Sequence, residues 1–574
     1  MPTASTKSDN RSRGNQPPAS LSGSTADISD RSWQIAALLI FAVAAFLRFY
    51  NLNLVPLHHD EGVNGNFLVR LVREGVYHYD PANYHGPTLY YFGAVFPWLL
   101  RLLFGTNAQN TYGLTNIAIR MVPALFGLAT VGLIFTLRRN LGTIATLVAA
   151  LLLAISPGAV YLSRYFIHET LFVFFTLALV VSLIKFYESA QAHHLMLAAI
   201  SAALLFATKE TAMISAGVLL ISLAMTLAYR RWFVRPTTAK PAKKKRQSIE
   251  EQPTFVRRIG GGNILAIWIA AAVVVFVAVY VVFYSSFFTN YPKGVYDSLR
   301  TFEFWRKTGQ QAHVHPFLTY VWWLFLQESP LLFLGAAGAL LTLRRNAKPL
   351  ALFSALWAFG LIAAYSLIAY KTPWLALSFL VPLALLSGSF IQWLHDELVG
   401  FGHSRSVVLA VGLLVLVGIL PGIARAWDHR EVHWKTFVPL YQTIDLNFIN
   451  YDNDDRYYVY VYAHTRRETL KLVDEINRIA QRSHQGGATG ITIVSPDYWP
   501  LPWYLRDYNR VGYYGHITPS NEPMILASTA QAAEIQATYG DRYQQVQSGF
   551  NPEGSFALRP GVDLLLYARR ELLP

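Results

Sequence analysis

The chain has 574 residues, of which 53% are hydrophobic and 14% are charged. Soluble domains carry roughly a quarter charged residues, so this composition excludes an ordinary soluble protein and indicates a membrane protein. The absence of cysteine excludes disulfides, thiolate metal sites and thiol catalysis. The formal net charge of +14 is concentrated in residues 230–258, which hold ten Lys and Arg against two acids. A basic loop between apolar segments is typical of a cytoplasmic loop facing anionic lipid, so we expect no nucleic-acid partner.

Residues 1–32 are rich in Ser, Asn, Gly, Thr and Pro and hold no apolar run, which predicts a disordered cytoplasmic tail. Twelve apolar stretches follow, and most approach the roughly 20 residues that a helix needs to cross the hydrocarbon core. The stretches are 33–49, 86–104, 117–137, 142–162, 170–187, 194–208, 211–229, 263–285, 317–343, 350–369, 373–393 and 406–424.

The basic residues that flank these stretches predict their orientation. Lys and Arg favour the cytoplasmic side, and basic clusters occur at 138–139, 230–258, 344–348 and 403–405. All four clusters face the cytoplasm only if 86–104 lies in the membrane interface instead of crossing. We therefore predict a plasma-membrane helical bundle of about eleven spans over residues 33–425, with a cytoplasmic N-terminus. Residues 50–116 then form the first extracytoplasmic loop, and residues 230–262 form a basic cytoplasmic loop.

Residues 426–574 have the pattern of a soluble domain, which the same topology places outside the membrane. Strand-like runs occur at 457–462, 491–495, 524–527 and 564–567, and helical patterns at 468–480 and 529–538. Strands that alternate with helices predict a small α/β domain. The predicted fold class is therefore mainly α: a polytopic membrane bundle followed by an extracytoplasmic α/β domain.

Polar residues gather in the segments that this topology places at the outer membrane face. The first loop begins with His58, His59, Asp60 and Glu61, and His85 follows later in the loop. Adjacent carboxylates at a membrane surface are candidates for a general base. They could equally complement the dipole of a helix that starts there.

Other outer segments supply more charged groups. They contain Arg164, His168, Glu169, Lys209, His313, His315 and Lys371. Taken singly, Glu169 could cap a helix, and Lys209 and Lys371 could extend their amines to the interface. Taken together, these groups suit a reaction in which a lipid phosphate leaves while a hydroxyl loses its proton. Such a reaction needs a base for the acceptor and fixed positive charge at the phosphate.

The order of motifs along the chain resembles that of the GT-C superfamily of membrane glycosyltransferases. The motifs include H-H-D-E-G-V-N-G, G-P-T-L-Y-Y, L-R-R-N-L-G, S-R-Y-F-I-H-E and K-T-P-W. The superfamily includes protein O-mannosyltransferases and lipid A aminoarabinose transferases. With the segment Y-W-P-L-P-W-Y-L-R-D-Y, the resemblance is closest to flippase-activity-associated membrane proteins of archaea and bacteria, and it covers most of residues 33–515.

The resemblance implies an inverting enzyme that transfers a sugar from a polyprenyl-phosphate donor to a protein or glycolipid acceptor outside the membrane. It implies catalytic roles for Asp60 and Glu169, with Glu61 as the neighbouring candidate. Lys371 is the leading candidate for binding the donor phosphate, and Arg164 and Lys209 are further candidates.

A divalent metal ion is an open question at this stage. His59, Asp60, His85 and His168 could hold Mn²⁺ or Zn²⁺, because carboxylate and imidazole ligands suit these ions. Histidines that are only hydrogen-bonded to nearby carboxylates are the alternative.

The run Tyr498–Tyr508 contains Trp499, Trp503 and two prolines. Its aromatic side chains could cover the cleft or stack on a sugar, or they could pack the soluble domain onto the membrane module. The spans hold few mid-span charges and no clear internal repeat, which favours an enzyme over a transporter. A non-catalytic protein that binds or flips a lipid-linked sugar remains the alternative function.

Overall fold

The computed structural model describes residues 28–82, 85–105, 111–233, 254–308, 313–344, 347–414, 439–452, 458–551 and 553–573. Within them, seven helices are long and apolar enough to cross a membrane. They are α1 (Asp30–Phe49), α4 (Asn116–Phe135), α8 (Glu169–Ser189), α10 (Ala212–Phe233), α12 (Gly262–Tyr284), α16 (Pro349–Leu367) and α17 (Leu377–Gly400), the last preceded by a 3-10 turn at Pro373–Ala376.

Two bent helix pairs raise this count to nine if each pair is one span. The pair α6 (Thr143–Ala154) and α7 (Pro157–Ser163) is bent by 60°, and the pair α14 (Thr319–Gln327) and α15 (Ser329–Leu341) by 114°. Of the remaining predicted spans, 194–208 corresponds to the shorter apolar helix α9 (Ala192–Phe206). The predicted span 406–424 begins as α18 (Arg405–Leu414) and then runs outside the described residues.

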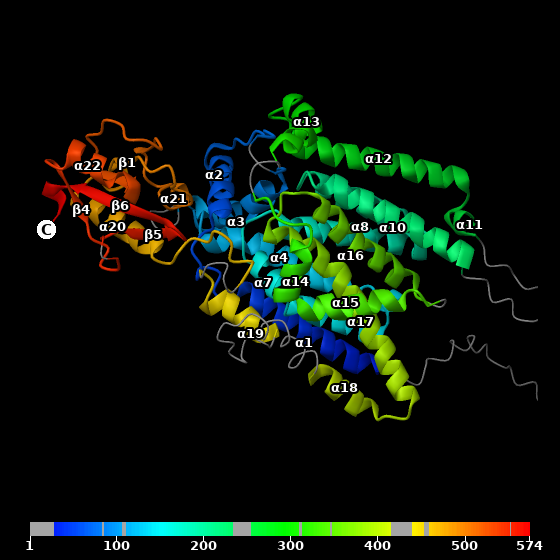
Figure 1. The fold of residues 1–574 in the computed structure, drawn as a ribbon. Helices are drawn as coiled ribbons and strands as arrows, with labels where there is room; N and C mark the ends of the chain where they lie inside the picture. The colour runs from blue at the N-terminus through cyan, green and yellow to red at the C-terminus, as the bar shows by residue number, and fades with distance from the viewer. Residues whose placement is uncertain are drawn as a thin grey trace, which may run out of the picture.

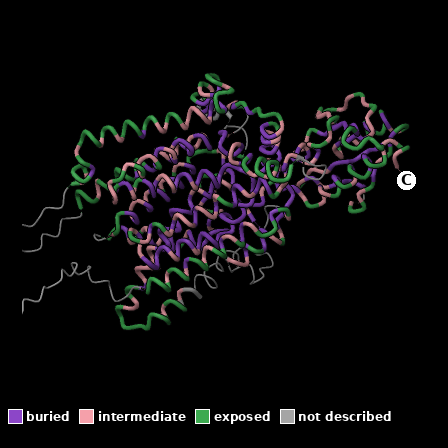
Figure 2. Tube along the Cα trace, turned by 180° about the vertical axis from the view of Figure 1, so that it is seen from behind, coloured by how far each residue is buried: buried purple, intermediate pink, exposed green. Residues whose placement is uncertain are grey.

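The core of the bundle consists of closely packed helices. Helices α4, α6, α8 and α17 bury most of their side chains against one another, whereas α12 stays exposed along nearly its whole length (Figure 2). An apolar helix with an exposed apolar surface is expected where the surrounding solvent is lipid. The chain is therefore a multi-pass integral membrane protein.

The described residues of three basic clusters lie at one end of the bundle. Arg138, in the short helix α5 (Arg138–Leu141), reaches Asp30 at the start of α1, with Nη2 and Oδ1 2.8 Å apart. Lys348 Nζ donates to the Leu141 carbonyl at 2.6 Å. The helix α11 (Phe255–Ile259), which holds Arg257 and Arg258, lies at the same end, opposite the C-terminal domain (Figure 1). This grouping is what the positive-inside argument requires of these clusters.

The first loop forms two helices at the other end of the bundle, where α2 (His59–Glu74) lies across the direction of α10 and α12 (Figure 1). The stretch predicted to lie in the interface is α3 (Thr88–Phe104), which is shorter than the spans. Helix α13 (Lys293–Thr308) follows α12 near this end.

The C-terminal domain is a mixed sheet in the order β2-β1-β3-β6-β4, with β5 also paired to β6. Strands β1 (Ile491–Ile493), β2 (Val511–Tyr513) and β3 (Met524–Ser528) are parallel neighbours, whereas β4 (Tyr543–Val546) and β5 (Phe556–Arg559) run antiparallel to β6 (Val562–Arg569). The helices are α20 (Thr469–Arg482), α21 (Leu501–Tyr504) and α22 (Ala532–Tyr539). Helix α20 buries Leu472, Ile476 and Ile479 against the sheet, which explains its strongly one-sided apolar pattern.

The predicted strand at 457–462 is wrong for its described residues 458–462, which have no strand structure. Tyr458 and Val461 instead join the core of the membrane bundle, and the Tyr458 hydroxyl donates to Asp445 at 2.5 Å. Helix α19 (Pro439–Ile444) packs beside α7 in the same region. The alternating aromatics are therefore buried by the bundle instead of pairing with the sheet.

Candidate functional site

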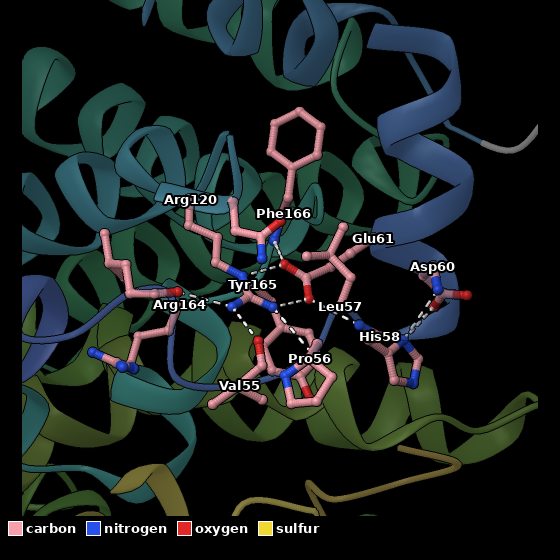
Figure 3. Close-up of polar contacts among 12 residues, drawn as sticks. Val55, Pro56, Leu57, His58, Asp60, Glu61, Arg120, Arg164, Tyr165 and Phe166 are labelled. Atoms are coloured by element: carbon pink, nitrogen blue, oxygen red, sulfur yellow. Dashed lines mark hydrogen bonds and ion pairs between the residues drawn. The ribbon is translucent and has the colours of Figure 1, made fainter. Parts of the chain in front are cut away.

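Helix α2 begins where the sequence places two consecutive acids, and Figure 3 shows their side chains turned in different directions. His58 is the N-cap: its Nδ1 accepts the Asp60 N–H at 3.1 Å, while Glu61 Oε2 accepts the His58 N–H at 3.0 Å. This reciprocal capping fixes the first turn of the helix. Asp60 and Glu61 consequently leave the helix on different sides.

Glu61 is fully buried and held by Arg120 of α4. Arg120 Nη2 and Nε donate to its two carboxylate oxygens at 2.6 and 2.8 Å, and the Phe166 N–H adds a further bond at 2.8 Å. Arg120 Nη1 also donates to the carbonyls of Leu52 and Val55 at 2.9 and 2.7 Å. A buried ion pair of this kind fixes the loops it joins. The carboxylate of Glu61 therefore faces Arg120 and does not line a cavity.

Arg164 also has a structural environment. Its Nη1 donates to the carbonyls of Leu47 and Tyr50 at 3.2 and 2.7 Å, and its Nη2 to that of Asn51 at 3.0 Å. These carbonyls end helix α1, so a cation there satisfies acceptors that lack helical partners. Both Nη groups of Arg164 are therefore directed to backbone carbonyls at the end of α1.

A cavity of about 1000 Å³ lies where α2, α8, the loop before α10 and the C-terminal domain meet. Its charged and imidazole side chains are His58, His59, Asp60, His85, His168, Glu169, Lys209, Glu210, His313 and Arg559. Tyr365, Tyr370 and Trp374 are among the aromatic residues of its wall. Asp60 and Glu169, which are far apart in sequence, thus line the same space.

Asp60 has the most open carboxylate of the site. Its side chain is 36% exposed, and the nearest ionisable partner among the described residues is His58 Nδ1, 3.9 Å from Oδ2. Glu61, the next residue, has no exposed side-chain surface. The two neighbouring carboxylates therefore differ in their access to the cavity.

Lys209 and Glu210 bring a second set of charges to the cavity. Lys209 Nζ donates to Glu169 Oε1 at the start of α8, and His85 Nδ1 lies 2.8 Å from Glu210 Oε2. Burial alone would lower the pKa of Lys209, but the carboxylates of Glu169 and Glu210 raise it above the usual range. Lys209 therefore stays protonated and supplies a positive charge on the cavity wall.

Two histidines of the site are held neutral. Burial is the main reason that the pKa of His168 lies well below its usual value, and His168 Nε2 lies 3.0 Å from the Gly86 carbonyl. Burial also lowers the pKa of His59 to about 4, and the nearby Arg559 contributes. A histidine that accepts a hydrogen bond from an arginine has its lone pair occupied at that nitrogen.

The four residues considered for a metal ion all line the cavity, but each contacts a different partner. His59 contacts Arg559 and Asp60 contacts His58, whereas His85 contacts Glu210 and His168 contacts Gly86. In the described part of the chain, no three His, Asp or Glu side chains are grouped closely enough to hold a metal ion. The residues present do not fit the divalent site that the sequence left open.

Lys371 is not among the residues that line the cavity. Its Nζ donates to the carbonyls of Ile368 and His315 at 2.6 and 3.2 Å, and its backbone N–H donates to His313 O at 3.0 Å. These bonds join residues 313–315 to the loop before α17. The Lys371 amine is therefore directed to backbone carbonyls beside the cavity. His313 does line the cavity, with Nδ1 2.5 Å from the Tyr462 hydroxyl, whereas His315 does not.

The run Tyr498–Tyr508 packs the C-terminal domain onto the membrane module. Trp503 is buried, its Nε1 donates to Asn116 Oδ1 at 2.8 Å, and its ring lies over Gly65 of α2. Trp499 is half-buried, with its ring centroid 6.2 Å from that of His59. Trp503 therefore lies packed between the C-terminal domain and the membrane module, while Trp499 lies close to the cavity.

Sequence reasoning missed Arg559 and did not select Glu210 as a site residue, although both line the cavity. Arg559 lies 500 positions beyond His59, its hydrogen-bond partner, and no motif marks it. Glu210 could have been found, because it follows Lys209 directly in the same outer segment.

The model of a family described as dolichyl-phosphate-mannose-protein mannosyltransferase matches residues 38–291. No curated protein matches the sequence. The structure is similar to that of ArnT from Cupriavidus metallidurans bound to undecaprenyl phosphate, with 16% sequence identity and a TM-score of 0.58, over 94% of this chain and 98% of that chain. The archaeal oligosaccharyltransferase AglB from Archaeoglobus fulgidus, in complex with an inhibitory peptide and a dolichol-phosphate, is 14% identical with a TM-score of 0.48, over 92% of this chain and 74% of that chain.

The likeness to ArnT extends over nearly the full length of both chains. It shows that this chain has the GT-C fold, with its helical membrane module followed by a C-terminal mixed-sheet domain. The predicted fold class is confirmed.

Proposed function

We propose that this protein is an inverting glycosyltransferase that takes a sugar from a polyprenyl phosphate and transfers it to an acceptor outside the membrane. One observation carries the proposal: the accessible carboxylate of Asp60 and the cation of Lys209 line the same cavity. The matched family is described by a dolichyl-phosphate-mannose donor, and the ArnT structure of the same fold is bound to undecaprenyl phosphate. These two likenesses support a polyprenyl phosphate as the donor.

In the proposed reaction, an acceptor hydroxyl attacks the anomeric carbon from the face opposite the phosphate. The new bond joins the acceptor oxygen to that carbon, the bond from carbon to phosphate oxygen breaks, and Asp60 takes the hydroxyl proton. The configuration at the anomeric carbon is thereby inverted. The electron pair of the broken bond stays on the departing polyprenyl phosphate.

Lys209 is the proposed partner of the departing phosphate. Its ammonium has three N–H donors, and one of them is directed to Glu169. We assign to Glu169 the role of positioning this ammonium, which differs from the catalytic role that the sequence implied. Fixed positive charge at the place where negative charge develops stabilises the transition state without reorganisation.

The dimensions and wall of the cavity fit this assignment. Ligand pockets usually measure about 300–1,000 Å³, and a cavity of about 1000 Å³ accommodates a sugar phosphate together with an acceptor hydroxyl. Tyr370 and Trp374 supply aromatic surface in the wall. Aromatic rings offer an apolar face of the kind that sugars pack against, beside polar groups that fix their orientation.

The test compares wild type with Asp60→Asn, using purified full-length protein in nanodiscs. Undecaprenyl-phosphate hexoses and pentoses serve as donors, solubilised membranes supply acceptors, and release of undecaprenyl phosphate is measured. Asparagine keeps the shape of the side chain but accepts no proton, so transfer should fall about 10²–10⁴-fold while donor binding persists. Glu74→Gln, at the exposed far end of the same helix, is the matched control and should keep wild-type transfer.

Unchanged transfer by Asp60→Asn would show that the base lies elsewhere. A wild-type protein that binds these donors tightly but transfers none of them would instead support the alternative function, in which the protein binds or flips a lipid-linked sugar.

A further inference from the structure

Arg559 brings a cation from the C-terminal domain to the cavity of the membrane module. It is the last residue of β5, an edge strand whose pairing with β6 is irregular between Ala557 and Arg559. Such irregularities redirect a side chain relative to a regular strand, and they often occur beside functional sites. Among the residues that line the cavity, Arg559 is the one that comes from a strand of the sheet.

The guanidinium joins the two parts of the protein. Its Nη1 donates to His59 Nδ1 of α2 at 3.0 Å, and its Nη2 donates to Asp497 Oδ1 in the loop after β1. These bonds use two of the five N–H donors of a guanidinium. Donors therefore remain for another acceptor that enters the cavity.

The two cations on the cavity wall have different counter-ions. Lys209 is paired with Glu169, whose side chain is only 7% exposed, so this pair is enclosed. The partner of Arg559 is Asp497, whose side chain is 44% exposed. A carboxylate that is well exposed to water binds its partner weakly, because water screens the attraction. Asp497 is therefore the counter-ion that an incoming anion could replace at low cost.

The charges on the wall leave few places where an anion can bind. Asp60, Glu169 and Glu210 provide three carboxylates, against the two cations Lys209 and Arg559. A substrate that carries phosphate or carboxylate oxygens needs a cation in the cavity with which to form charge-assisted hydrogen bonds. Arginine matches the planar geometry of an oxyanion through two parallel N–H groups.

We propose that Arg559 is an anion-binding residue of the cavity, which exchanges Asp497 for phosphate or carboxylate oxygens of a substrate. The exchange couples the C-terminal domain to the occupied site, because Arg559 keeps its bond to His59 while it changes its acidic partner. This inference rests on the proposed function, in which both a lipid phosphate and an acceptor enter the cavity. The anion belongs either to the lipid donor or to a substrate that arrives from water.

The test uses two variants that act in opposite directions. Arg559→Gln removes the cation, so affinity for the anion should fall about tenfold, as expected for the loss of a hydrogen bond to a charged group. Asp497→Asn removes the competing carboxylate, so the same affinity should rise. Arg510→Gln is the matched control, because Arg510 pairs with Glu522 on the same domain, at 2.7 Å, and does not line the cavity.

Binding is measured on full-length protein in nanodiscs with undecaprenyl phosphate, and with inorganic phosphate after undecaprenyl phosphate has saturated the protein. Opposite shifts for undecaprenyl phosphate assign Arg559 to the lipid phosphate. Opposite shifts for inorganic phosphate alone assign it to the water-borne substrate. The inference is overturned if neither probe responds, or if both variants shift affinity in the same direction, as a purely structural ion pair requires. Since binding is measured without turnover, a lack of sugar transfer would reject the proposed function and leave this test intact.

Discussion

The consecutive acidic residues Asp60 and Glu61 differ in burial and in ion pairing. Glu61 is enclosed with Arg120, at 0% and 1% side-chain exposure, and each oxygen of the carboxylate accepts a short hydrogen bond. Removing one member of a buried pair leaves the other charge unpaired, which is costly. Asp60 is open to the cavity and has no comparable ion pair among the described residues. The start of α2 thus anchors Glu61 and leaves Asp60 accessible to the cavity.

A second residue-scale feature is His464, which is buried at the junction between the domains. Tyr165 and Tyr161 lie within hydrogen-bond reach of its Nδ1, and its ring stacks on that of His58 with centroids 5.6 Å apart. Burial lowers the pKa of His464 well below its usual value, and nearby His58, Arg120 and Arg466 act in the same direction. The folded protein therefore holds this imidazole neutral.

We expect this histidine to make the protein less stable in mild acid. Below the usual histidine pKa of about 6.5, the unfolded chain binds a proton at His464 that the folded chain does not bind. The free energy of unfolding therefore falls as pH decreases from about 6.5, by up to about 1.4 kcal/mol per pH unit. His464→Gln should have a shallower fall, measured by chemical denaturation in detergent between pH 8 and pH 5. Parallel curves for the two proteins below pH 6.5 would contradict the prediction.

At the scale of elements, the contact between α2 and α21 positions the C-terminal domain. Gly62 and Gly65 lie one turn apart on α2. A Cβ added to Gly62 would lie 2.5 Å from Pro500 Cβ, and one added to Gly65 would lie 2.6 Å from the Trp503 ring. Glycine is needed here because the two backbones approach closely. Arg73 at the far end of α2 adds a bond to the Arg506 carbonyl at 2.6 Å. The run Tyr498–Tyr508 of the C-terminal domain thus packs against the side of α2 on which the two glycines leave room.

Gly65→Ala tests this close packing, because it decides whether the substitution raises or lowers the free energy of unfolding. In an exposed helix interior, replacing glycine with alanine stabilises by roughly 1 kcal/mol. At position 65 the added methyl group meets the buried Trp503, so we expect a net destabilisation of about 1–3 kcal/mol. The thermal midpoint should fall, and limited proteolysis between the two domains should become faster. Gly217→Ala in α10 is the control, since nothing lies within 4 Å of its added Cβ, and its midpoint should stay equal or rise.

At the scale of the whole molecule, the two ends of the bundle differ in charge and in chemistry. The described basic clusters gather at the end remote from the C-terminal domain, and the cavity lies at the end next to it (Figure 1). The positive-inside rule predicts that the basic end faces the cytoplasm. The cavity and the sheet domain then face outwards, where a lipid-linked sugar would meet its acceptor.

The absence of cysteine allows a direct test of this orientation. Single cysteines at Ser548 in the C-terminal domain and at Ser248, which lies outside the described residues, are probed on intact cells with a membrane-impermeant thiol reagent. We expect labelling at 548 and none at 248, and labelling at both after the cells are opened. The opposite pattern on intact cells would reverse the orientation and place the cavity in the cytoplasm.

The sequence by itself determined the membrane class, the position of most spans and the α/β character of the C-terminal region. These depend on local properties: a span needs a continuous apolar run, and strands and helices have their own periods. The tertiary structure alone decided that Glu61 is enclosed while Asp60 is open, and that Lys209 lines the cavity while Lys371 bonds to carbonyls. It also brought Arg559 to His59 across 500 positions. The direction of a side chain and the identity of its partners depend on segments distant in sequence, which local composition does not encode.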